Sequence, residues 1–225
     1  CIEYFTHLVE HQIVHLDPLR SCSLYAHVGH LLDVYMQHGL GTSWIDLTRT
    51  IDGGLMMESD DVADEILLIL RIMSQFANKK LADWYDVVDD ASASAAKKAS
   101  ETIDKSILVG LRMVVPNMSP KVMRYPKVCE EYFRFVAFAC EGYPSQMMSL
   151  GEQVSRGILD TIRFGLQHHN SVIVRQSLRS IQEMSEHCAK QNGLVIARTA
   201  RKLPQGVAPK PVNSPVLQDW LHFLI

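Results

Sequence analysis

The chain has 225 residues, of which 47% are hydrophobic and 21% are charged, and its formal net charge is −3. This length can bury a substantial core, and the composition is typical of a folded soluble protein. A net charge this close to zero provides no long-range attraction to nucleic acid or to an anionic membrane, so we expect neither as a partner. The apolar run Ile66–Leu70 is far too short to span a bilayer.

Apolar residues recur at helical spacing in the first half of the chain. The spacing predicts a helix over 21–38 and another over 61–77, where an acidic start suits a helix N-terminus. A third helix is expected over 104–115, with Asp104 as its N-cap and Pro116 at its end. We find no convincing period-two alternation outside loops, so the sequence predicts no β-sheet.

The second half carries three further amphipathic patterns. Pro126 occupies the position of a first helical residue, and the pattern behind it continues to about residue 141. Residues 152–168 and 172–190 also separate apolar from polar positions at helical spacing. Each of these patterns predicts a helix with one buried side and one polar side.

The predicted helices are separated alternately by short and by long connections. The long ones fall near 40–59, 86–101 and 193–215. The segment 89–100 is small and polar, which favours a surface loop, although its alanines would also permit a helix. Prolines exclude a regular helix from 202–215, and a final helix is expected after it.

Alternating short and long connections predict antiparallel helix hairpins that stack on one another. A hairpin cannot cover its own apolar surface, so neighbouring hairpins must stack to bury it. The distance in sequence between the starts of successive hairpins lies in the range of HEAT and armadillo repeats. We therefore expect an all-α fold, with residues 1–225 forming one α-solenoid segment of HEAT-like or armadillo-like repeats. The clearest hairpins are 104–118 with 121–141, and 150–168 with 172–190.

The ends of the sequence and its cysteines indicate the kind of protein. The sequence opens within one apolar pattern at Cys1-Ile2 and stops within another, so we expect a segment of a longer chain. The cysteine count is odd and no C-x-x-C pair occurs, which favours reduced core residues of an intracellular protein. The cysteines are Cys1, Cys22, Cys129, Cys140 and Cys188.

One stretch near the start offers a competing interpretation. His7, Glu10 and His11 spell H-x-x-E-H, the inverted zinc-protease signature, and His15 continues the spacing of four. A zinc hydrolase would need both histidines on one helical face, Glu10 as general base and a third ligand from elsewhere. In a chain with 10 histidines such a match also arises by chance. We favour a partly exposed helix face, because no later helix supplies an obvious further ligand.

No other pattern in the sequence carries catalytic chemistry. It contains no dinucleotide fingerprint, no G-K-[ST] phosphate loop, no G-x-S-x-G and no kinase signature. Nothing places a serine or cysteine beside a histidine as nucleophile and base. The sequence therefore predicts a protein that is not an enzyme and that uses no metal or cofactor.

The region from Ile107 to Lys190 contains a distinctive order of elements. In "VGLRMVVPNMSPKVMRYPKVCEEYFRFVAFACEGYP" a helix ends in a proline, and Met-Ser, aromatic-Pro-Lys-x-Cys, Tyr-aromatic and aromatic-Pro follow in turn. The next long helix ends in "EHCAK", residues 186–190. These elements resemble the exportin-4 branch of the importin-β (karyopherin) superfamily. The resemblance is thinner on both sides of this region, and it places the chain near the C-terminal end of a much longer receptor.

This resemblance implies a HEAT-repeat superhelix that binds protein cargo together with the GTP form of the GTPase Ran and releases cargo after GTP hydrolysis. It also implies shuttling between nucleus and cytoplasm, through weak contacts with the phenylalanine-glycine repeats of nuclear pores. Members of this branch carry the hypusine-containing translation factor and some transcription regulators. The usual Ran-contacting repeats lie toward the N-terminal half of such receptors, so no Ran-binding residue is assigned here. The alternative is another HEAT-repeat adaptor or scaffold without Ran dependence.

The polar faces of the second hairpin helices form the candidate partner-binding surface. In HEAT arrays of this kind the second helix of each hairpin usually faces the inner wall of the superhelix. Acidic side chains there would suit a cationic group of a cargo, whereas a solvated face without a partner is the plainer interpretation. The candidates are Glu130, Glu131, Arg134, Arg175, Arg179, Gln182 and Glu186.

Overall fold

The computed structural model describes residues 4, 6, 7, 16, 18–35, 56–78 and 93–191. All regular elements within these residues are helices and none is a strand, so the all-α prediction is confirmed. The α-helices are α2 (Pro18–Tyr35), α4 (Met56–Asn78), α6 (Ala93–Val114), α7 (Pro126–Gly142), α8 (Pro144–Met148), α9 (Glu152–Leu166) and α10 (Ser171–Gln191). Two 3₁₀ turns, η3 (Val115–Asn117) and η4 (Val122–Arg124), connect α6 to α7.

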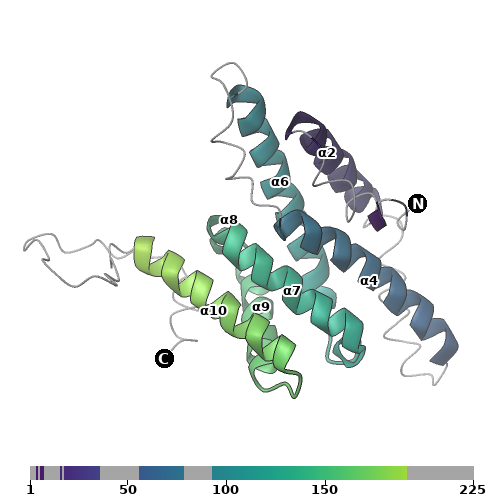
Figure 1. Ribbon diagram of the computed structural model, residues 1–225. Coiled ribbons are helices and arrows are strands. Elements are labelled where there is room, and N and C mark those ends of the chain that lie inside the picture. The colour runs from purple at the N-terminus through teal and green to yellow at the C-terminus, as the bar shows by residue number, and fades with distance from the viewer. Residues whose placement is uncertain are drawn as a thin grey trace, which may run out of the picture.

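Three helices, α4, α7 and α10, lie side by side in a row with α7 in the middle (Figure 1). The C-terminal ends of α4 and α7 meet, since a Cβ added to Gly142 would lie 3.3 Å from the Ala77 carbonyl oxygen. Near the other end, the Asn170 amide just before α10 bonds to Glu130 in the first turns of α7. The three helices of the row therefore run in the same direction.

Helices α6 and α9 pack against this row and lie between its members along the chain. Helix α6 packs beside α2 and also contacts α4, and α9 packs against α10 and α7. Asp104 in α6 accepts a hydrogen bond of 2.6 Å from the Gln146 side chain, which lies just beyond the end of α7. The other end of α6 leads through η3 and η4 into the start of α7, so the chain reverses between these two helices, although α6 packs mainly on α2. Helices α9 and α10 pack directly on each other as a hairpin.

The core is centred on α7, which is enclosed by α4, α10 and α9. Tyr132, Phe133 and Phe135 of α7 and Phe76 of α4 are among the largest fully buried side chains. The rings of Tyr132 and Phe133 meet edge to face with their centroids 5.4 Å apart, a favourable geometry for aromatic pairs. The Tyr132 hydroxyl is satisfied by the Thr161 hydroxyl of α9 at 2.9 Å, so the largest buried side chain carries no unpaired polar atom.

The connection between α6 and α7 follows the sequence signals closely. Pro116 lies in η3, where it ends the helix, and the Asn117 side-chain amide donates to the Met113 carbonyl oxygen at 2.7 Å. Pro126 is the first residue of α7, as predicted, because its fixed φ suits that position and its missing N–H would have no helical partner there. The short turn therefore sets the antiparallel entry of α7.

The predicted loops 40–59 and 86–101 both overlap observed helices. Helix α6 begins at Ala93, so the prediction that Asp104 caps its N-terminus is wrong, and Asp104 lies inside the helix. The alanines of this segment permit a helix, and the packing of α6 against α2 favours helix over a surface loop. Burial raises the pKa of the Asp104 carboxyl, an effect that the hydrogen bond from Gln146 offsets only in part. Helix α4 likewise starts before the predicted helix 61–77.

Several sequence predictions fall outside the described residues. These include the loop over 193–215, the final helix after it and most of the histidine-containing stretch at the start. Among the helices that can be described, none combines the length and the apolar character needed to cross a membrane.

Three cysteines of the described helices behave as core residues. Cys129, Cys140 and Cys188 are buried and free. Burial raises the pKa of the Cys129 thiol to about 11 and that of Cys140 to about 12. Both thiols therefore stay protonated near neutral pH and are poor nucleophiles.

Candidate protein-binding surface

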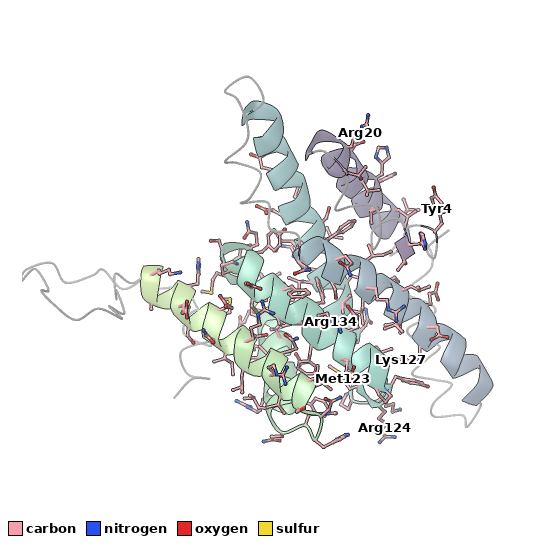
Figure 2. The ribbon with its side chains drawn as sticks, in the orientation of Figure 1. Tyr4, Arg20, Met123, Arg124, Lys127 and Arg134 are labelled. Atoms are coloured by element: carbon pink, nitrogen blue, oxygen red, sulfur yellow. The ribbon has the colours of Figure 1, made fainter. Side chains whose placement is uncertain are left out.

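The polar sides of α7 and α10 form one adjoining surface, because the two helices pack side by side and in the same direction. Arg134, with Lys127 two turns before it, lies along α7 (Figure 2). Arg134, Arg175 and Gln182 are exposed, whereas Glu130, Arg179 and Glu186 are partly buried. The structure thus places six of the seven predicted residues, all except Glu131, at the surface of two neighbouring helices.

Glu131 differs from the other candidates because it is buried, with a relative exposure of 6%. It occupies the same side of α7 as Gly142, which lies eleven positions or about three turns later and contacts α4. Its carboxylate accepts a hydrogen bond of 2.9 Å from Arg134, so the buried charge is compensated. Glu131 therefore anchors Arg134 and is not itself open to a partner.

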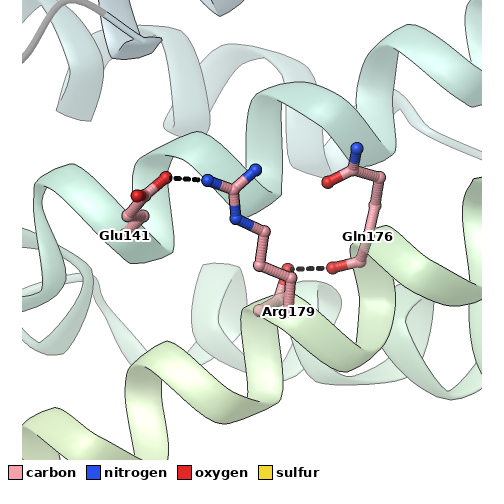
Figure 3. Close-up of polar contacts among 4 residues, drawn as sticks. Glu141, Gln176 and Arg179 are labelled. Carbon is pink, nitrogen blue, oxygen red and sulfur yellow. Dashed lines mark hydrogen bonds and ion pairs between the residues drawn. The ribbon is translucent and has the colours of Figure 1, made fainter.

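Arg179 links the two helices of the surface. Its guanidinium, from α10, forms an ion pair with Glu141 of α7 (Figure 3). The same group lies 5.5 Å from the centre of the Phe138 ring, within cation–π distance. Sequence analysis identified Arg179 but neither of its two partners, since spacing along one helix does not reveal contacts with the next.

We expect the pair formed by Arg179 and Glu141 to stabilise the packing of α7 and α10 modestly. Both side chains are partly exposed, at 38% and 20%, so solvent screens the attraction. A double-mutant cycle with Arg179→Met and Glu141→Gln should give a coupling of about 0.5–1 kcal/mol in chemical denaturation. The coupling should shrink in high salt; a value that does not respond to salt would contradict an electrostatic origin.

Asn170 supports the surface from the turn between α9 and α10. Its side-chain oxygen accepts a hydrogen bond of 2.8 Å from the Val172 backbone N–H, the geometry of an N-cap for α10. Its side-chain nitrogen donates to the Glu130 carboxylate at 2.5 Å. Sequence analysis missed this residue, although an asparagine directly before a helix is a recognised cap signal.

The turn before Asn170 contains two stacked histidines. The rings of His168 and His169 lie 4.3 Å apart, and the Asn170 backbone N–H donates to His168 Nδ1 at 3.1 Å. Burial, and then the neighbouring His169, lower the pKa of His168, whereas Glu130 acts in the opposite direction. A neutral His168 at pH 7 fits its role as a hydrogen-bond acceptor for the backbone.

The outer side of α10 carries the remaining candidates. The Gln182 side-chain nitrogen donates to the Glu186 carboxylate at 3.1 Å. Arg175 is exposed and forms no ion pair with a carboxylate in the part of the chain that is described. Beside Arg179, the buried side-chain oxygen of Gln176 accepts no hydrogen bond within the described residues, and Figure 3 shows its amide directed the same way as the guanidinium. This surface therefore offers charged and amide groups to a partner.

Apart from the exposed Arg175, the side chains described on this surface form ion pairs or hydrogen bonds with amides. Of the three residues in the zinc hypothesis only His7 is described, and it is exposed; Glu10 and His11 lie outside the described residues. The described residues contain no group of three side chains able to hold a metal ion. No protein-family model matches the chain, and no solved structure matches it significantly.

Proposed function

We propose that this chain is part of a nuclear transport receptor that resembles the exportin-4 branch and carries protein cargo from nucleus to cytoplasm. The observation that carries the proposal is the order of elements between Ile107 and Lys190. This region runs from the second half of α6 through α7 to the end of α10, and within it α9 and α10 pack as a hairpin. The receptor acts by binding and release, without covalent chemistry.

The arrangement of these helices supports a HEAT-like α-solenoid. In such arrays the second helices of successive hairpins lie side by side and parallel. Equivalent positions of α7 and α10 are in contact, since Glu130 and Asn170 are 40 residues apart and Glu141 and Arg179 are 38 apart. Helix α4 continues the same row on the other side of α7. A period of about 40 residues is typical of HEAT and armadillo repeats.

The charges on α7 and α10 favour a cationic group in the cargo. Glu130 and Glu186 bond to the neutral amides of Asn170 and Gln182. These bonds hold the carboxylates in place without neutralising them, unlike the ion pair of Glu141 with Arg179. Glu130 lies beside the start of α10 and Glu186 lies near its end, so each carboxylate would attract a separate cationic group of a cargo, such as the side chain of the hypusine-containing translation factor.

Binding energy in a solenoid can be exchanged between two partners. Each repeat touches only its neighbours, so small changes between repeats accumulate into a different curvature. If Ran in its GTP form and cargo favour the same curvature, each raises the affinity for the other by the same factor. GTP hydrolysis then removes Ran in its GTP form and thereby lowers the affinity of the receptor for cargo. Ran would bind through the rest of the receptor, and pore repeats through further weak surface contacts.

The proposal predicts a GTP-dependent complex. The full-length protein that contains this chain should retain cargo from a nuclear extract when Ran is locked in its GTP state. Binding should fall at least about tenfold with the GDP form, which corresponds to an ordinary coupling energy between sites. Ran locked in its GDP state is the matched control. Partners that bind equally with both forms, or with no Ran, would contradict export and favour a Ran-independent scaffold.

A further inference from the structure

Helix α10 is the last described member of the row, and one of its sides lies at the edge of that row (Figure 1). The side that faces α7 is marked by Arg179 and Gln176, and the ion pair with Glu141 fixes its direction. At about 100° per residue, positions 174, 178 and 181 lie roughly half a turn away from these two residues. They therefore face away from α7, along the edge.

This edge is apolar. It is formed by Val174, Leu178 and Ile181, which are spaced at i, i+4 and i+7, the pattern of a helix face that packs against another element. Leu178 is 55% exposed, the largest exposed fraction among the apolar side chains of α10, and the other two are partly buried. Ile181 also packs partly against the core, so the edge offers an apolar site centred on the exposed Leu178.

The chain itself contains a segment that fits this edge. After Gln191 a further 34 residues follow, since 225 − 191 = 34. In the segment 216–225, apolar residues recur at helical spacing while polar residues fall between them. The apolar positions are Val216, Leu217, Trp220, Leu221, Phe223, Leu224 and Ile225, and the polar ones are Gln218, Asp219 and His222.

We propose that residues 216–225 pack as an amphipathic helix against the exposed edge of α10. The connection over 192–215 is long enough, since an extended chain spans about 3.3 Å per residue and a helix rises only about 1.5 Å per residue. Attachment to the same chain gives the segment an effective concentration of the order of millimolar, which favours it over a second copy. The proposal is independent of whether the protein carries cargo.

Charge is consistent with this pairing. Arg175 is exposed three residues before Leu178 and forms no ion pair with any carboxylate that the structure describes. Asp219 is the only charged residue of the segment, apart from the titratable His222, and it lies directly before Trp220. A helix that buries Trp220 against Leu178 would bring Asp219 and Arg175 to the rim of the contact, where opposite charges favour one orientation.

Cysteine labelling of the full-length protein tests this contact. Leu178→Cys is made with the natural segment and, separately, together with Trp220→Asp and Leu221→Asp. The rate at which maleimide modifies position 178 is followed by peptide mass spectrometry, so that the native cysteines do not interfere. We expect labelling to be at least about tenfold faster when the two aspartates disrupt the segment. Val172→Cys, on a different side of the same helix and 38% exposed, should label at the same rate in both backgrounds.

Two other labelling outcomes contradict the proposal, and a third passes the decision to a cross-link. Fast labelling of position 178 in both backgrounds would mean that the edge is open or is kept for a separate partner. Slow labelling of position 178 that becomes faster on dilution, but is the same with and without the two aspartates, would mean that a second copy covers the edge. If position 172 also became faster, the aspartates would have loosened α10 as a whole, and an oxidative cross-link between Leu178→Cys and Leu221→Cys then decides. A failure to form that cross-link overturns the proposal.

Discussion

Phe133→Ala should destabilise the protein by about 3–5 kcal/mol, the range observed when a large aromatic side chain is removed from a core. Phe133 has no exposed surface and lies where α7, α9 and α10 meet. Its ring packs edge to face on Tyr132 and borders the backbone of Gly165 in α9. Since three helices surround the position, they cannot all move to fill the cavity, and most of the cost should persist.

The measurement is chemical denaturation of the variant and of a matched control. Phe164→Ala removes the same side chain from a position that is 41% exposed, so it should cost less than about 1 kcal/mol. A comparable cost at both positions would mean that the buried junction of α7, α9 and α10 contributes little. A loss below about 1 kcal/mol for Phe133→Ala would mean that the core is centred elsewhere.

The helices were predictable because their signals are local. The repeat of apolar positions behind Pro126 fixes both the start of α7 and its buried face. The start of α6 was not predictable in the same way, because the segment before Asp104 is rich in alanine and also in small polar residues. These residues favour helix and loop by similar amounts, and only packing against α2 decides between them.

The surface on α7 and α10 was predictable only in outline. The polar stripe of each helix identifies which residues avoid the core, and six of the seven candidates do lie at the surface. Glu131 is the exception, because α4 covers that side of α7 and sequence spacing does not show how far a neighbour extends. The links from Arg179 to Glu141 and from Asn170 to Glu130 join residues about 40 positions apart, so they depend on how the hairpins stack.

Gly165→Ala should destabilise the protein, although alanine is the better helix former. At an open helical position this change would stabilise by up to about 1 kcal/mol. Here the added Cβ would lie only 2.5 Å from Cε1 of Phe133 and would also collide with the Ser177 hydroxyl of α10. Both neighbours are fully buried, so α9 must shift away from them, and we expect a net loss of about 1–3 kcal/mol.

A second glycine of the same helix separates this clash from the change in helix propensity. At Gly157 an added Cβ would meet a single methyl group of Val115 at 2.8 Å, so Gly157→Ala should cost less than Gly165→Ala. Thermal and chemical denaturation of both variants measure the difference. A further test combines Gly165→Ala with Ser177→Ala, which removes one of the two colliding atoms and should recover part of the loss. If Gly165→Ala stabilised the protein, α9 would not be in close contact with α7 and α10, and the stacked hairpins on which the binding surface depends would be wrong.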